Sequence, residues 1–402
     1  MYSLIIFAVM ALYARQQGNF FLGLLMLPSL FFYSLAYELK DSALSAQYFD
    51  FNYINDYSLY IVFGFVLIFS VVAALNRRIS GRAVELDPPA PMPPTAIRRA
   101  TIIYYVLSSV ATIAFVTNLS NVNFDIGLLF LNPRIYEEIF GKSTGVNYLY
   151  FLNVPALCIS IYLRQKLKRP HAAGIIDAIL IFMSFFHGIK FTVFDTFLLP
   201  ALFYFHCSRQ PRRALFVLGL TVFVLLCFYL AFSVGVRGFL DDEGPLFSAI
   251  LNYILPNFYN LAYSIQVQPI QFDPISILIP DKVPNPLLPI LSPGEYGFIL
   301  NDRFNMATAY ANIYAILPPF SWLLFAPLLV RFRYRVILLK RRTQKLHWVF
   351  IAAYIDFCIF FVWYFYAFNK TKYVYYVIVM VTIGYIVHLR TTRRISAKKV
   401  RL

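Results

Sequence analysis

Residues 214–234 read ALFVLGLTVFVLLCFYLAFSV, an uncharged apolar stretch between the basic pair Arg212 and Arg213 and the sequence GVRG at 235–238. A helix crosses the hydrocarbon core of a bilayer with about 20 mostly apolar residues. The stretch therefore predicts a transmembrane helix. The segment that follows, residues 235–311, is too rich in proline to span a membrane but apolar enough to fold. We expect it to form a partly helical loop that acts as a lid or cleft wall on the membrane surface.

The rest of the chain repeats this apolar character. Of its 402 residues, 60% are hydrophobic and 13% are charged, and the mean hydropathy is +0.66. Soluble proteins carry about a quarter charged residues. The composition predicts an all-α polytopic membrane protein whose single membrane domain covers residues 1–402. Apolar runs long enough to span suggest about eleven transmembrane helices, at 2–14, 19–37, 58–76, 101–117, 147–163, 175–189, 191–206, 214–234, 312–330, 348–369 and 373–390.

The basic residues indicate the orientation of these spans. Alternate connections hold 26 of the 35 Lys and Arg residues, including seven between Arg331 and Lys345. By the positive-inside rule this side is cytoplasmic, which places the C-terminus inside and the N-terminus outside. The net charge of +16 is therefore explained by topology and anionic lipid headgroups, and not by binding to nucleic acid.

The two longest loops, 118–146 and 235–311, lie on the opposite side, where we expect function to be built. The cytoplasmic connections hold almost no carboxylates and no Gly-rich phosphate loop. This excludes an ATP-driven pump and a cytosolic nucleotide-sugar transferase. The four cysteines lie in or at the ends of apolar runs, so neither a disulfide framework nor a thiolate metal site is expected.

A cation and a histidine lie together at the turn between the runs 175–189 and 191–206. The turn, residues 186–190, reads FHGIK, and His187 is the histidine expected at the outer boundary. Ionisable groups near membrane depth are costly, which favours anion binding by Lys190 at this turn. The alternative is that Lys190 only reaches the interface while His187 packs with a satisfied hydrogen bond.

Two arginines flank the long loop 235–311. Arg237 lies between glycines that allow a ligand to approach closely, and its guanidinium matches the geometry of phosphate oxygens. Arg303, in the sequence NDRFN at 301–305, precedes the next apolar run. Both are predicted to contact an anionic ligand, with interfacial anchoring as the alternative.

The earlier loop contains NPRIYEE at 132–138, in which Glu137 and Glu138 follow Arg134. A like-charged neighbour and partial burial both raise the pKa of a carboxyl group, so this pair could supply a general base. A solvated amphipathic turn is the alternative.

Three acidic residues fall within the expected spans, Asp195 and Asp356 well inside them and Asp177 nearer a cytoplasmic end. Such groups are typical of proton relays, and Asp195 is placed to pair with a neighbouring cation. The spacing of His and carboxylate residues matches no metal site.

The chain resembles the O-antigen polymerase family, the oligosaccharide repeat-unit polymerases of Gram-negative bacteria. The resemblance lies in the plan of many spans with one or two large periplasmic loops and in the basic residue of HGIK at 187–190. It also lies in GVRG at 235–238 and in the polar and aromatic entry to the next span at 305–314. Arg134 and Gly145 are separated by ten residues, a spacing that some members show. The resemblance covers nearly the whole chain.

This resemblance implies an enzyme of the bacterial inner membrane that polymerises undecaprenyl-pyrophosphate-linked glycans at the periplasmic face. A terminal sugar hydroxyl of one lipid-linked repeat unit would attack the anomeric carbon of the growing chain and expel polyprenyl pyrophosphate. Fixed positive charge would stabilise the leaving group without a metal or cofactor, supplied by Arg237, Lys190, Arg303 and Arg134. The hydroxyl would need a base, for which the candidates are Glu137, Glu138 and His187.

The expected partners are membrane lipids and a chain-length regulator protein.

Two other functions stay open at the level of sequence. A flippase for lipid-linked oligosaccharides would line a central cavity with cations, whereas here they gather at the outer boundary. An O-antigen ligase would use the same donor but a different acceptor, so the identity of the acceptor separates it from a polymerase.

Overall fold

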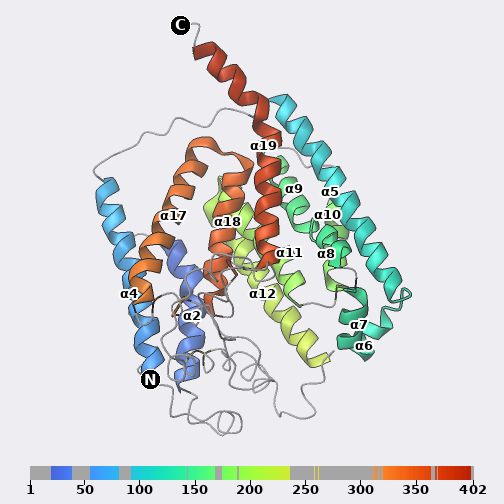
Figure 1. Cartoon of the computed structure of the whole chain (residues 1–402), viewed down its shortest axis with the longest axis horizontal. Helices are drawn as coiled ribbons and strands as arrows, with labels where there is room; N and C mark the ends of the chain where they lie inside the picture. The colour runs from blue at the N-terminus through green and yellow to red at the C-terminus, as the bar shows by residue number, and fades with distance from the viewer. Residues whose placement is uncertain are drawn as a thin grey trace, which may run out of the picture. The chain divides into compact units, whose positions relative to one another are not determined.

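A computed structural model of the chain describes residues 20–38, 55–80, 92–142, 144–167, 174–187, 190–235, 320–363 and 370–399, and residues 258, 261, 310, 313, 314, 317, 367 and 368. All regular structure in this part of the chain is helical (Figure 1). The elements are α2 (Phe20–Glu38), α4 (Asn55–Ser80), α5 (Pro94–Asn121), α6 (Gly127–Leu131), α7 (Pro133–Phe140), α8 (Thr144–Tyr150), α9 (Asn153–Leu167), α10 (Gly174–Phe185), α11 (Lys190–Cys207), α12 (Pro211–Gly235), α17 (Ser321–Thr343), α18 (Leu346–Phe360), the 3₁₀ helix η2 (Phe361–Trp363) and α19 (Thr371–Lys399).

Several helices have the length and composition of membrane spans. Within the described residues, four stretches are long and apolar enough to cross a membrane: Pro94–Asn121, Gly145–Lys166, Pro211–Phe228 and Thr371–Leu389. Five shorter apolar helices cover Phe21–Tyr33, Tyr60–Leu75, Gly174–Phe185, Thr192–Cys207 and Leu346–Phe360. These stretches coincide with runs that the sequence predicted. The expected run 2–14 and nearly all of the loop 235–311 lie outside the described residues.

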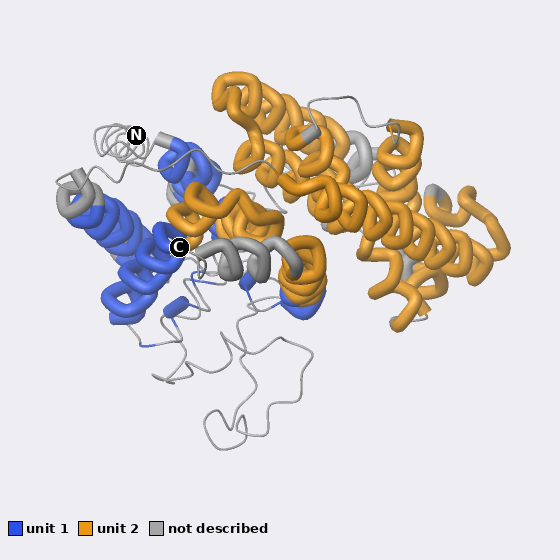
Figure 2. The backbone as a smooth tube through the Cα atoms, turned by 90° about the horizontal axis from the view of Figure 1, so that it is seen from above, with its two compact units in different colours: residues 1–85, 240–335, 358–374 blue, residues 86–239, 336–357, 375–402 orange. Residues whose placement is uncertain are grey.

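The chain forms two compact units (Figure 2). Unit 1 comprises residues 1–85, 240–335 and 358–374, and unit 2 comprises residues 86–239, 336–357 and 375–402. Helix α17 belongs to unit 1 as far as Arg335 and to unit 2 from Val336.

Several helices differ in extent from the expected spans, and α17 is one of them. A span at 312–330 was expected to end at a basic connection, but α17 begins at Ser321 and continues through the basic residues to Thr343. The physical reason is that Arg, Lys and Leu are good helix formers, so charge ends the apolar stretch without ending the helix.

The expected span 147–163 is divided into α8 and α9 at Phe151 and Leu152. Pro155 explains the break, because it has no N–H to donate to the carbonyl of Phe151 and its ring would clash with that carbonyl in a continuous helix. In the first turn of α9 the missing donor costs nothing. The Asn153 side chain accepts the N–H of Val154 at 2.8 Å and so helps to start the new helix.

In unit 2, α5 packs against α8 and α9, and α11 packs against α9 and α12. Small residues on the buried face of α5, including Ala100, Ser108 and Ala111, allow a close approach. The Asp177 carboxylate of α10 joins three helices. It accepts hydrogen bonds from Tyr104 of α5 at 2.8 Å and from Ser160 of α9 at 2.7 Å, and forms an ion pair with Arg164. A carboxylate inside the apolar bundle is thus compensated by three donors.

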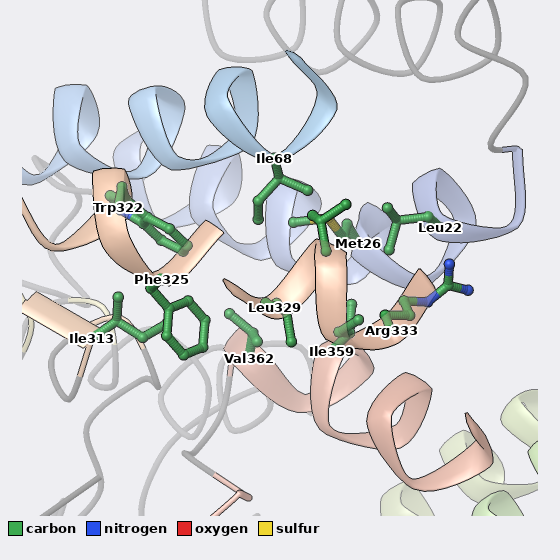
Figure 3. Close-up of a pocket in the computed structure, with 11 residues that line it drawn as sticks. Leu22, Met26, Ile68, Ile313, Trp322, Phe325, Leu329, Arg333, Ile359 and Val362 are labelled. Carbon is green, nitrogen blue, oxygen red and sulfur yellow. The ribbon is translucent and has the colours of Figure 1, made fainter. Parts of the chain in front are cut away.

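Unit 1 contains a small apolar cavity (Figure 3). The space open to the centre of a water-sized molecule is about 20 Å³, and Arg333 lies at one end of the lining. Nearby, the Tyr60 and Ser321 hydroxyls are 2.5 Å apart, joining α4 to α17. A Cβ atom at Gly64 would lie 2.2 Å from the Trp322 ring, so only glycine lets these two helices approach this closely. The remaining apolar lining residues are Leu22, Met26, Ile68, Ile313, Trp322, Phe325, Leu329, Val330, Ile359 and Val362.

Candidate functional site

The turn between α10 and α11 holds the most enclosed of the predicted site residues. His187 is 1% exposed. Its Nδ1 lies 3.5 Å from the Thr192 hydroxyl, a long contact one turn into α11. In this conformation the imidazole is a core group, so it is enclosed by protein and not presented to a solvent-facing substrate.

Helix α7 packs directly on this turn. Asn132 accepts the N–H of Ile135 at 3.3 Å and Pro133 follows it, which is a favourable helix start. The Tyr136 hydroxyl donates to the carbonyl of Phe186 at 2.7 Å, and the Phe140 ring lies 5.2 Å from the His187 ring. The structure therefore brings two of the predicted constellations together, residues 132–138 and residues 186–190.

The contact of α7 has an electrostatic consequence. Tyr136 is fully buried, and burial raises the pKa of its phenol above the ordinary value. The hydroxyl accordingly stays protonated and keeps its donor role at neutral pH. On the other face of α7, Glu138 is exposed. The helix thus presents a carboxylate outward while its aromatic face stays fixed to the turn.

Two further aromatic rings lie against His187, and a third ring contacts one of these two. Tyr150, at the end of α8, stacks on the imidazole with centroids 4.7 Å apart, and Phe151 lies at 5.6 Å. Tyr376 of α19 contacts Phe151 at 6.4 Å. The break between α8 and α9 is what turns Tyr150 and Phe151 towards the imidazole. We call Tyr136, Phe140, Tyr150, Phe151, His187, Asp195 and Tyr376 the His187 cluster.

Asp195 adds a carboxylate to this cluster. It is completely buried on α11 and lies near the Tyr150 and Tyr376 hydroxyls. The next residue, Thr196, accepts a hydrogen bond from the Asn153 side chain at 3.2 Å. Among the described residues, the Tyr150 hydroxyl has no hydrogen-bond partner. Buried polar groups in proteins are nearly always hydrogen-bonded. A cluster with several buried polar side chains is therefore a candidate functional site in a membrane protein.

The other predicted site residues are located as follows. Lys190 is the first residue of α11, and Arg134 and Glu137 lie on α7 beside Glu138, but the side chains of all three are outside the described ones. Arg237 and Arg303 are also outside the described residues. The structure thus brings α7 to the His187 turn and leaves the contributions of the two arginines as predictions.

A second group of ionisable residues, in which His206 and Asp356 are buried and Lys340 is half-buried, lies at the other end of α11. Lys340 of α17 donates to Nδ1 of His206 at 3.1 Å, and Nε2 of His206 lies 2.7 Å from a carboxylate oxygen of Asp356 on α18. Lysine can only donate, so Nδ1 accepts and Nε2–H donates to Asp356. We call these three residues the His206 relay. Sequence reasoning noted Asp356 but missed the relay, because nothing in the local pattern pairs residues this far apart in the chain.

No group of three His, Cys, Asp or Glu side chains in the described part of the chain is arranged to hold a metal ion. Comparison with protein-family models, with curated proteins and with solved structures gives no match for this chain.

Proposed function

We propose that the protein polymerises polyprenyl-pyrophosphate-linked oligosaccharide repeat units into O-antigen at the periplasmic face of the bacterial inner membrane. In this proposal the chain crosses the membrane eleven times, with the N-terminus in the periplasm and the C-terminus in the cytoplasm. The apolar helices and the distribution of Lys and Arg support this topology.

One contact carries the proposal for the site, the hydrogen bond from Tyr136 to the carbonyl of Phe186. It fixes α7, with its carboxylates, beside the turn that leads into α11. Lys190 begins that helix, where free backbone N–H groups and the helix dipole favour an anion. A base and a phosphate-binding region at one site are what glycosyl transfer from a lipid pyrophosphate requires.

The reaction can be written with these residues in named roles. The acceptor hydroxyl forms a C–O bond to the anomeric carbon and gives its proton to a carboxylate of α7. The bond from that carbon to the pyrophosphate breaks, and polyprenyl pyrophosphate leaves against positive charge. Glu138 is the exposed carboxylate and so the preferred base, with Glu137 as its neighbour.

The burial of His187 favours a positioning role for this residue over direct proton transfer. Lys190, Arg134, Arg237 and Arg303 are proposed to stabilise the pyrophosphate without a metal. A chain-length regulator protein remains the proposed protein partner.

The test is complementation of a strain that lacks its own polymerase. We expect the intact protein to restore a lipopolysaccharide ladder, and Glu138→Gln, Lys190→Gln and Arg237→Ala to reduce it to single repeats at equal membrane abundance. Lys142→Gln is the matched control, because Lys142 is exposed and lies just beyond α7. Purified activity should persist after chelation of metal ions.

The outcomes separate the alternatives. An intact protein that restores no long chains would exclude the polymerase and favour a flippase or a ligase. Transfer of single repeats to the lipid A core would identify a ligase. If Glu138→Gln supported a full ladder, the base would have to be sought elsewhere.

A further inference from the structure

Helix α17 carries one exposed line that changes from apolar to basic. Leu324, Leu328, Arg331 and Arg335 are spaced by four, three and four residues, which places them on one side of a helix. The leucines are 45% and 58% exposed, and both arginines are exposed. With a rise of about 1.5 Å per residue, the line extends about 16 Å. All four residues belong to unit 1.

The other basic residues near this line have different roles. Arg333, between the two exposed arginines, is 8% exposed and lies at one end of the lining of the unit 1 cavity (Figure 3). Lys340 belongs to the His206 relay. Helix α17 contains no Asp or Glu, and no ion pair involves Arg331 or Arg335 within the described part of the chain. Among the described residues, these two guanidinium groups are therefore available to an anion from outside.

The pattern matches the chemistry of an anionic phospholipid. Two arginines one helical turn apart can direct both guanidinium groups to one phosphate, whose oxygens match their geometry. The leucines continue from this point along the apolar part of the helix, where an acyl chain would lie. Anionic headgroups gather near basic residues that border a span.

We propose that Leu324, Leu328, Arg331 and Arg335 form a binding site for an anionic phospholipid, with its phosphate between the arginines and an acyl chain along the leucines. A free phosphate has no acyl chain and would make no contact with the leucines. The site lies outside the His187 cluster and does not depend on the proposed polymerisation.

The experiment uses the full-length purified protein and counts bound lipid by native mass spectrometry during titration with phosphatidylglycerol. Phosphatidylcholine with the same acyl chains tests the charge, and glycerol phosphate tests the headgroup alone. We expect tight binding only for phosphatidylglycerol. Loss of charge-assisted hydrogen bonds in R331Q/R335Q should weaken that binding at least about tenfold.

Two variants keep the test specific. R212Q/R213Q removes the same charge from an exposed pair at the start of α12 and should bind phosphatidylglycerol like the wild type. R331K/R335K keeps the charge but removes the forked donors, so its affinity should fall between those of the wild type and R331Q/R335Q. Circular dichroism checks that each variant is folded.

Three results would overturn the proposal. They are undiminished binding by R331Q/R335Q, an equal loss in R212Q/R213Q, and binding of glycerol phosphate as tight as that of the whole lipid. A polyprenyl pyrophosphate that displaced phosphatidylglycerol at lower concentration would reassign the site to the lipid-linked glycan.

Discussion

Two buried histidines at the two ends of α11 are held in opposite ways. His187, just before the helix, is packed among the rings of Phe140, Tyr150 and Phe151. His206, near its other end, lies between Lys340 and Asp356. The two imidazoles are almost equally buried, but aromatic packing holds His187 and charged neighbours hold His206. The same residue type at the two ends of α11 therefore has a different sensitivity to substitution.

The largest effect is expected from His206→Phe. The ring would fit, but Asp356 and Lys340 would lose their link through the imidazole inside the protein. Disrupting a buried charged network costs about 3–5 kcal/mol of unfolding free energy. Unfolding of the purified protein in detergent, followed by circular dichroism, measures the loss. Stability equal to that of the wild type would show that the relay does not hold α11, α17 and α18 together.

His187→Phe should cost much less, under about 1.5 kcal/mol, because one planar ring replaces another among aromatic neighbours. The same unfolding measurement applies. This variant also sharpens the proposed function. A folded His187→Phe protein that still restores the lipopolysaccharide ladder would confirm a positioning role, and one that restores none would return His187 to the list of bases.

Tyr136→Phe removes the hydrogen bond from α7 to the carbonyl of Phe186. We expect a loss of about 1 kcal/mol and faster amide exchange in α7. Tyr105→Phe, at a tyrosine that is 41% exposed on α5, is the matched control and should change neither. Unchanged exchange in the Tyr136 variant would mean that Phe140 alone holds the helix.

The smallest effect is expected from Tyr150→Phe. Its hydroxyl has no hydrogen-bond partner among the described residues, so removing it should leave stability unchanged or slightly higher. Ring stacking on His187 is retained. A loss of 1 kcal/mol or more in the unfolding experiment would reveal a bond that this hydroxyl makes in solution.

The sequence predicted the positions of the apolar helices because length and hydropathy are local properties. It also placed His187 and the carboxylates near Glu138 among the candidates, since charged groups near a membrane boundary are rare enough to notice. It did not predict that α7 rests on the His187 turn. That contact depends on Tyr136 and Phe140, which differ in no local respect from the many other aromatic residues of the chain.

Three other differences have separate causes. The helical continuation of α17 was missed because hydropathy reports where a membrane ends, and helix propensity decides where a helix ends. The His206 relay was missed because its three members come from three helices. The break at Pro155 was visible in the sequence, but a search for apolar length gives no weight to a single proline.

That break has a consequence for mutational experiments. Since Pro155 has no hydrogen on its nitrogen, it cannot donate a hydrogen bond to the carbonyl oxygen of Phe151. This acceptor is a main-chain atom of the His187 cluster. A scan that replaces side chains one by one will change the rings and charges around it and leave the acceptor intact. Only a replacement of Pro155 itself would give the Phe151 carbonyl a backbone N–H donor. We therefore expect Pro155 to be among the positions most sensitive to substitution.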